Sequence, residues 1–273
     1  MFLSISDFLK YLILGLVQGI TEPLPISSSG HIMIFKNVFN VYIENNINFT
    51  IIVNFASFIA IVLYYRLFLK EIIIGAWNYL FKKDLNGKKD FLYILFVAIA
   101  TVPAGIAGIL LMDTIENHLS SLTTVGIALF FTSMLLFIIH YASKKANNEN
   151  ITLKTSVLMG FAQVLGLLPG ISRSGVTTSF AVLNKTKVEK ALRFSFMMYI
   201  PISIASMILG ISDIDSTNTY IPGYIIAFIA SLIGTYFALK LFFKLVKKDN
   251  LKHFGYYCLT VSIFVLIYVF FIK

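Results

Sequence analysis

Six long apolar stretches decide what this chain can fold into. Each holds about 20 residues, the length that an α-helix needs to cross a hydrocarbon core of about 30 Å. Only 13% of the 273 residues are charged, whereas about 25% are charged in a soluble domain. The sequence therefore excludes a soluble fold and predicts one integral membrane domain over residues 1–273, an all-α polytopic membrane protein. The predicted spans are residues 49–69, 91–112, 122–142, 191–211, 222–243 and 254–272.

Two further apolar segments, residues 8–20 and 156–168, are too short to span. Each is apolar for only about a dozen residues before Pro, Gly and Ser interrupt it. Because irregular backbone is tolerated at membrane depth only inside protein, we interpret both segments as re-entrant helical hairpins that enter the membrane and turn back.

The distribution of Lys and Arg predicts the topology. There are five Lys and Arg residues in segment 70–90, seven in segment 144–190 and four in segment 244–253. Segments 113–121 and 213–221 have none. By the positive-inside rule the three basic segments are cytoplasmic, and both termini lie outside. The first re-entrant segment then enters from outside and the second from the cytoplasm. We assign the net charge of +9 to cytoplasmic loops and anionic lipid, and not to nucleic acid.

An internal repeat relates the two halves of the chain. Residues 14–32 align with residues 159–177 at an offset of 145 positions, and each copy, about 1–143 and about 151–273, contributes one re-entrant hairpin and three spans. An odd number of spans inverts the second copy, so we predict two inverted-topology repeats whose re-entrant tips face each other. The identical pairs are Gly15/Gly160, Gln18/Gln163, Ile26/Ile171, Ser27/Ser172, Ser29/Ser174 and Gly30/Gly175.

Both predicted tips, Pro25–His31 and Pro169–Gly175, place Pro and Gly beside serines. Pro and Gly break a helix, and Ser caps the next one, whose N-terminus favours an anion. Arg173 adds a planar fork that matches phosphate oxygens. Arg193 either faces the headgroup region, the role that we favour, or adds a second phosphate contact. The predicted phosphate or diphosphate site thus comprises Arg173, Ser27, Ser29, Ser172, Ser174 and, in the second interpretation, Arg193.

Gln18 and Glu22 are four residues apart and share one helix face. A carboxylate at membrane depth is costly unless a cation or a polar partner meets it. Glu22, with Gln18, could therefore hold a divalent metal that bridges to the substrate phosphates, the interpretation that we favour, or Glu22 could pair directly with Arg173.

His31 follows Ser28 by three residues, close enough in a helical turn for the imidazole to reach the hydroxyl. This spacing permits a serine nucleophile that a histidine base activates. His31 could equally deprotonate a water molecule or protonate the leaving phosphate. The sequence leaves these mechanisms open.

Three motifs resemble one enzyme family. QGITEPLPISSSGH at 18–31 and PGISRSGVTTSF at 169–180 look like the two signature motifs of the undecaprenyl-diphosphate phosphatase family, also called the bacitracin resistance protein BacA family, and ALRFSFMMYIP at 191–201 joins them in order and spacing. The resemblance implies a multi-pass enzyme of the bacterial plasma membrane that hydrolyses undecaprenyl diphosphate to the monophosphate and phosphate. That reaction recycles the lipid carrier for peptidoglycan synthesis and gives bacitracin resistance.

The resemblance also implies an active site open to the outer face, dependence on Mg²⁺ or Ca²⁺, and residue roles. Glu22 corresponds to the essential acidic residue, Ser28 to the proposed nucleophile, His31 to the motif histidine and Arg173 to the phosphate-binding arginine. Two positions depart from the family pattern: Gln18 stands where Glu is frequent, which weakens a two-carboxylate metal site, and Pro23 replaces an aromatic residue. The surrounding hydroxyls of the family motifs correspond to Ser27, Ser172, Ser174 and Thr177.

A different class of function also suits inverted repeats. The protein could transport or flip a lipid phosphate or another anion through the same site. Release of phosphate from a lipid diphosphate separates the two hypotheses, because a transporter releases none. In either case the predicted partners are a polyprenyl diphosphate lipid and the bilayer, and a homodimer is compatible with the sequence.

Overall fold

The computed structural model describes residues 5–43, 46–211, 221–246 and 251–271. Within these ranges the only β-type contact is an isolated bridge between Asn148 and Thr186, so the predicted all-α class is confirmed. The helices are α1 (Ile5–Thr21), α2 (Ser28–Val38), α3 (Asn46–Lys82), the short 3₁₀ helix η1 (Leu85–Gly87), α4 (Lys88–His118), α5 (Leu122–Ser143), α6 (Leu153–Leu165), α7 (Arg173–Leu183), α8 (Val188–Ile211), α9 (Ile221–Val246) and α10 (Leu251–Phe271).

The predicted spans fall within six long helices, α3, α4, α5, α8, α9 and α10, which are long and apolar enough to cross a membrane. The two short apolar segments form α1 and α6, and each is followed by a second short helix, α2 or α7. The arrangement of long spans and short helical pairs therefore agrees with the sequence. Ile272 and most of the predicted outer segment 213–221 lie outside the described residues, as do residues 247–250 of the segment 244–253.

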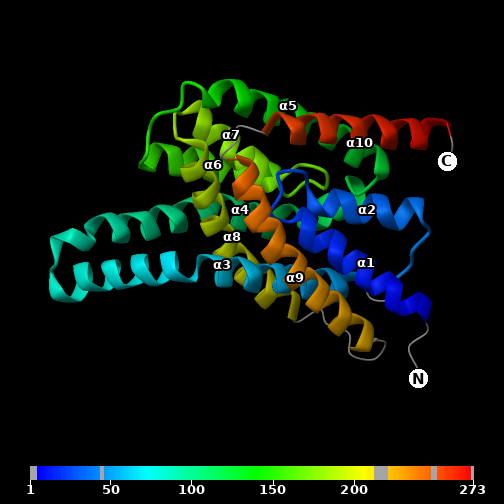
Figure 1. The fold of residues 1–273 in the computed structure, drawn as a ribbon, viewed down its shortest axis with the longest axis horizontal. Coiled ribbons are helices and arrows are strands. Elements are labelled where there is room, and N and C mark those ends of the chain that lie inside the picture. Colours follow the sequence, from blue (N-terminus) through cyan, green and yellow to red (C-terminus); the bar gives the residue numbers. More distant parts are fainter. Residues whose placement is uncertain (1–4, 44–45, 212–220, 247–250, 272–273) are drawn as a thin grey trace.

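The predicted loop at residues 70–90 is wrong, because this segment is almost entirely helical. α3 has 37 residues and α4 has 31, so α3 is roughly 55 Å long at 1.5 Å per residue. Figure 1 shows the two helices projecting together beyond the rest of the molecule. Glycine permits the close approach of η1 to α3 at this end, since a Cβ on Gly87 would lie 2.0 Å from the carbonyl oxygen of Gly75. The Lys residues of this segment indicated that it connects two spans, but they did not predict whether its backbone is helical.

Large apolar side chains cover the outside of the helices. Ile109, Phe237 and Phe270 are 72%, 63% and 70% exposed in the isolated chain. A soluble monomer rarely exposes apolar surface on this scale. The exposed apolar faces instead suit lipid, so the fold is that of a polytopic membrane protein.

Helix α1 packs against α9 through small residues. A Cβ on Gly15 would lie 2.5 Å from the carbonyl oxygen of Ala227, and one on Gly19 would lie 2.4 Å from that of Ser231. Small residues spaced four apart allow such close approach of membrane helices. Helix α6 contacts α4 in a similar way at Gly160. These contacts fix where the C-terminal ends of α1 and α6 lie.

Candidate active site

The turns that follow α1 and α6 touch each other. The hydroxyl of Ser27 accepts a hydrogen bond from the backbone N–H of Gly170 at 3.1 Å, which confirms that the two tips meet. Ser27 has φ of 70° and Gly170 has φ of 96°, both in the left-handed region. A non-glycine residue in that region is strained, and such strain is concentrated at functional sites.

A serine caps the helix that leaves each tip. The hydroxyl of Ser27 accepts from the backbone N–H three residues ahead at 3.4 Å, and that of Ser172 does so at 3.1 Å. Thr132 of α5 supports the second tip, because its hydroxyl donates to the Gly170 carbonyl at 2.9 Å and accepts from the Ser172 N–H at 3.1 Å. The two serines thus shape the tips. Their contact with phosphate stays a prediction.

Glu22 lies at the centre of the polar cluster. One carboxylate oxygen accepts from Arg173 at 2.6 Å, and the other accepts from Gln18 Nε2 at 2.9 Å and from the Ser28 hydroxyl. The Glu22 side chain is only 7% exposed. A carboxylate buried this deeply is tolerated because one cation and two neutral donors satisfy it. The structure thus contains the direct Glu22–Arg173 pair, the interpretation that the sequence disfavoured.

Arg173 is held from a second side by Tyr199 of α8. The guanidinium carbon lies 3.9 Å from the centre of the Tyr199 ring, a distance suited to a cation–π contact. The Tyr199 hydroxyl in turn donates to the backbone carbonyl of Asn54 at 3.2 Å. This stacking fixes the plane of the guanidinium fork.

Asn54 of α3 completes the cluster. Its side-chain oxygen accepts from Gln18 Nε2 at 2.6 Å, so Gln18 Nε2 lies between the oxygens of Asn54 and Glu22. Sequence reasoning missed both Asn54 and Tyr199. An amide inside the apolar stretch 49–69 was the available signal, because a polar side chain at membrane depth is a functional candidate.

His31 does not bond to Ser28. Its Nδ1 lies 2.7 Å from the Ser27 carbonyl oxygen and its Nε2 lies 2.9 Å from the hydroxyl of Tyr257. In the neutral ring Nδ1 therefore donates to the carbonyl and Nε2 accepts from Tyr257. The Ser28 hydroxyl donates to Glu22 instead. The expected Ser28–His31 hydrogen bond is thus not formed, and Tyr257 of α10 is a partner that no motif indicated.

The remaining hydroxyls of the predicted phosphate site differ in accessibility. Ser29 is exposed, and its hydroxyl lies 3.3 Å from that of Ser27. Ser174 is buried, 3.4 Å from the Ser172 hydroxyl. Both serines adjoin the caps, and Ser29 is the one open to solvent or ligand.

Thr177 and Arg193 have other partners. The Thr177 hydroxyl is fully buried, donates to the Arg173 carbonyl at 2.8 Å and lies 2.7 Å from the Ser195 hydroxyl. The Arg193 guanidinium carbon lies 4.9 Å from the centre of the Phe68 ring. In the described part of the chain neither side chain bonds to Glu22. A structural role agrees with both environments, and phosphate contact stays a prediction.

The cluster combines three groups that a hydrolase of phosphate compounds needs. Glu22 can accept a proton, Ser28 offers a hydroxyl nucleophile, and Arg173 offers several N–H donors to an anion. All three come from the two tips, inside a bundle of apolar helices. The fold and the site therefore define a polytopic helical membrane protein with a partly buried acid–serine–arginine centre.

Comparison with known proteins identifies the family. The model of the family described as "Bacitracin resistance protein BacA" matches residues 11–264, and the chain belongs to this family. "Undecaprenyl-diphosphatase 2" of Bacillus thuringiensis is 43% identical over 263 residues, which cover 95% of this chain and 97% of the relative. "Undecaprenyl-diphosphatase" of Oceanobacillus iheyensis is 41% identical over 94% of this chain and 95% of the relative. The similarity therefore includes both tips and nearly every helix.

Proposed function

We propose that this protein hydrolyses undecaprenyl diphosphate to undecaprenyl phosphate and inorganic phosphate. The reaction would recycle the lipid carrier for peptidoglycan synthesis and give resistance to bacitracin. One observation carries the proposal: relatives 43% identical over 95% of the chain are named for this activity. The cluster of Glu22, Ser28 and Arg173 supplies groups suited to the chemistry.

Arg173 binds the diphosphate. A guanidinium presents five N–H donors in a rigid fork, so Arg173 can contact phosphate oxygens in addition to Glu22. The stacking on Tyr199 holds the fork in one plane. Such preorganised donors stabilise the charge that develops on the transferred phosphoryl group.

Ser28 is the proposed nucleophile and Glu22 its base. The Ser28 oxygen attacks the terminal phosphorus while its proton passes to Glu22, with which it already bonds. The bond between that phosphorus and the bridging oxygen breaks, and the bridging oxygen leaves with the electron pair as part of undecaprenyl phosphate. A water oxygen then attacks the phosphoserine, Glu22 returns its proton to the departing Ser28 oxygen, and the protons of the water stay on the inorganic phosphate.

His31 positions the first tip. Its bonds to the Ser27 carbonyl and to Tyr257 connect the strained turn to α10. Because Ser27 precedes Ser28 directly, these bonds set where the Ser28 hydroxyl lies. We therefore assign His31 to positioning and Glu22 to proton transfer.

The proposal includes Mg²⁺ or Ca²⁺. Hard cations take oxygen ligands, and the oxygens of Glu22 and Asn54 already converge on one Gln18 nitrogen. If the Gln18 side-chain amide flips, its oxygen takes the place of its nitrogen beside the oxygens of Glu22 and Asn54. Three oxygens then face one point, an arrangement that favours a cation, so these residues fit the group. Glu22, Gln18 and Asn54 would hold the ion. When bound, it would neutralise charge on the diphosphate.

We also propose the inverted-topology repeat and its orientation in the plasma membrane. Three features support them: both copies have the same helix order, the close contacts of α1 on α9 and α6 on α4 correspond, and the two tips touch. The start of α1 and the end of α10 lie at one end of the molecule, opposite the turn between α3 and α4 (Figure 1). Together with the positive-inside rule, this arrangement supports the proposal that both termini lie outside and that the site opens to the outer face. A homodimer stays a prediction.

Phosphate release by purified protein in detergent tests the function. We expect inorganic phosphate from undecaprenyl diphosphate, and loss of that release when a chelator removes divalent metal. The transport hypothesis predicts no phosphate from the same sample. The relatives reported above are named for diphosphate hydrolysis, so hydrolysis is the function retained.

A further inference from the structure

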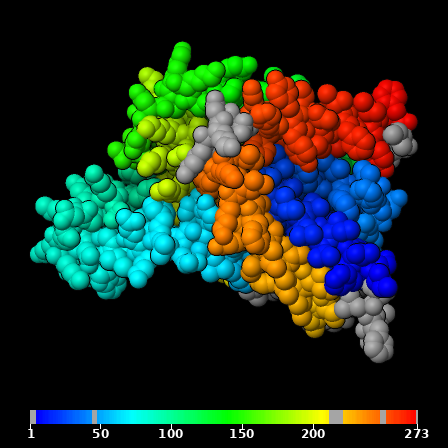
Figure 2. All heavy atoms as spheres, in the orientation of Figure 1, coloured from blue at the N-terminus to red at the C-terminus, as the bar shows by residue number. Residues whose placement is uncertain are grey.

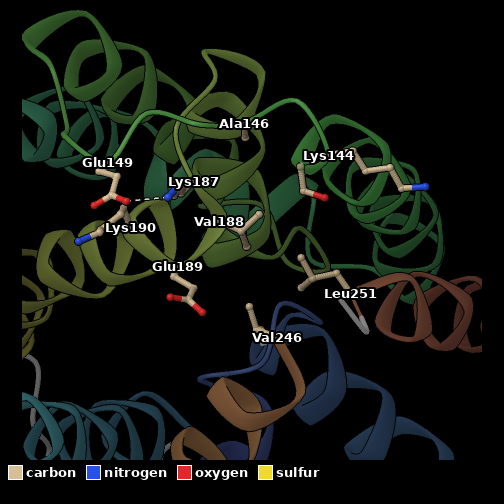
Figure 3. Close-up of a pocket in the computed structure, with 10 residues that line it drawn as sticks. Lys144, Ala146, Glu149, Lys187, Val188, Glu189, Lys190, Val246 and Leu251 are labelled. Atoms are coloured by element: carbon tan, nitrogen blue, oxygen red, sulfur yellow. Dashed lines mark hydrogen bonds and ion pairs between the residues drawn. The ribbon is translucent and has the colours of Figure 1, made fainter. Parts of the chain in front are cut away.

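Two cavities flank the region where α9 ends and α10 begins. The first, about 550 Å³, has charged and apolar side chains in its lining, and Figure 3 shows two of the charged residues, Lys187 and Glu149, bonded to each other. That bond, 2.6 Å long, lowers the pKa of the exposed Glu149 carboxyl. The cavity shares no residue with the acid–serine–arginine cluster. Its charged lining residues make it a poor site for an alkyl chain.

The second cavity, about 600 Å³, has almost entirely apolar walls. Figure 2 shows the elements that form it, α1, α9 and α10, meeting on one face of the molecule. Its polar lining residues are Thr21, whose hydroxyl bonds to its own helix at 2.6 Å, and His253. The apolar lining residues are Ile20, Leu24, Ile26, Leu245, Phe254 and the ring of Tyr257.

This apolar groove adjoins the first tip of the candidate active site. Thr21 directly precedes Glu22, and Ile26 directly precedes Ser27. Tyr257 belongs to both, because its ring lines the groove while its hydroxyl bonds to His31 at 2.9 Å. The groove thus lies directly beside the first tip, and residues that flank Glu22 and Ser28 in the sequence form part of its wall.

We infer that this groove holds the isoprene units next to the diphosphate of the lipid substrate. The inference rests on the proposed function, which places the diphosphate at Arg173. A prenyl diphosphate carries an apolar chain directly on its charged group, so the chain must leave the polar cluster through apolar walls. The groove matches that requirement in place and chemistry, and its volume is in the range of small-molecule sites. The remainder of the chain then lies in the bilayer.

Thiol protection tests the inference without relying on turnover. Ile20→Cys and Leu9→Cys, each in a Cys258→Ser background, are reacted with N-ethylmaleimide in detergent. Ile20 and Leu9 are both 46% exposed and both lie on α1, but only Ile20 lines the groove. We expect farnesyl diphosphate to slow labelling of Ile20→Cys by roughly tenfold and to leave Leu9→Cys unchanged. Inorganic pyrophosphate should protect neither thiol.

Three outcomes would overturn the inference: equal protection of Ile20→Cys by pyrophosphate and farnesyl diphosphate, equal protection of both thiols, or protection by phospholipid alone with no further effect of farnesyl diphosphate. The last would assign the groove to bilayer lipid.

As a second measurement, Ile20→Trp should raise KM for farnesyl diphosphate roughly tenfold, with little change in kcat, while Leu9→Trp changes neither. Phosphate release without selective protection contradicts only the groove, whereas selective protection without release contradicts only the proposed function.

Discussion

The two tips share a sequence pattern but differ in their chemistry. At the offset of 145 positions, Gln18 corresponds to Gln163, yet Gln18 bonds to Glu22 and Asn54. In the part of the chain that the structure describes, neither amide atom of Gln163 has a hydrogen-bond partner, although the residue is 1% exposed. The position that corresponds to Glu22 is Leu167.

In the proposed repeat, the pattern shared by the two tips would supply the scaffold, and the residues that differ would supply the reaction. Both copies retain the serine cap and the break in the helix. Only the first copy carries the carboxylate, while the second contributes Arg173 at the position that corresponds to Ser28. The proposed site therefore draws on both copies, because the proposed acid and nucleophile lie on the first tip and the proposed anion-binding group lies on the second.

The largest expected effect is a loss of kcat on substitution of Ser28, with Ser29 as the control. We expect Ser28→Ala to lower kcat at least about 10³-fold while affinity for a non-hydrolysable diphosphonate stays nearly the same, because the nucleophile is lost and Arg173 remains. Ser29→Ala is the matched control and should keep activity within a few-fold. Acid quench and mass spectrometry of the peptide that carries both serines should find phosphoserine in the unsubstituted enzyme. Absence of phosphoserine together with an active Ser28→Ala enzyme would establish attack by water.

A smaller but still large effect is expected at the second tip. Arg173→Lys should lower kcat/KM about 100-fold, or about 3 kcal/mol, because a point charge cannot replace a two-pronged contact. Arg193→Lys serves as the control, since the Arg193 guanidinium packs on Phe68 and not on Glu22. Comparable losses in both variants would instead support the second phosphate contact at Arg193.

Substitution of the two corresponding glutamines, Gln18 and Gln163, compares the two copies directly. Gln18→Met should lower kcat/KM about tenfold, because it removes a donor to Glu22. Gln163→Met should leave the rate unchanged and raise the free energy of unfolding by about 1 kcal/mol, because it removes a buried amide without a partner. Kinetics and thermal unfolding in detergent measure the two effects. An equal loss of rate in both variants would show that the second copy also takes part in the reaction.

The topology prediction involves no change in rate. Asn86→Cys and Glu116→Cys, in a Cys258→Ser background, are treated on intact cells with a thiol reagent that does not cross the membrane. Residues 113–120 are predicted outside and residues 82–89 in the cytoplasm, so only Glu116→Cys should react. Labelling of Asn86→Cys alone would reverse the orientation and open the site toward the cytoplasm.

The sequence by itself determined the class of fold and several candidate members of the site. Hydrophobic length located all six spans, and Pro, Gly and Ser located both tips, because these signals depend on local backbone chemistry and on the thickness of the bilayer. The cost of a buried carboxylate made Glu22 a candidate, and the fork geometry of arginine made Arg173 a candidate; the structure joins the two in an ion pair.

Only the tertiary structure decided which side chains meet. Spacing along the chain made His31 the expected partner of Ser28, but the fold of the tip turns the Ser28 hydroxyl toward Glu22 and His31 toward Tyr257. Asn54 and Tyr199 enter the site from α3 and α8. Asn54 lies in none of the three motifs, and the motif at 191–201 contains Tyr199 without indicating its contact with Arg173. The physical reason is that periodicity predicts neighbours on one helix, whereas contacts between helices depend on packing at small residues far away in the sequence.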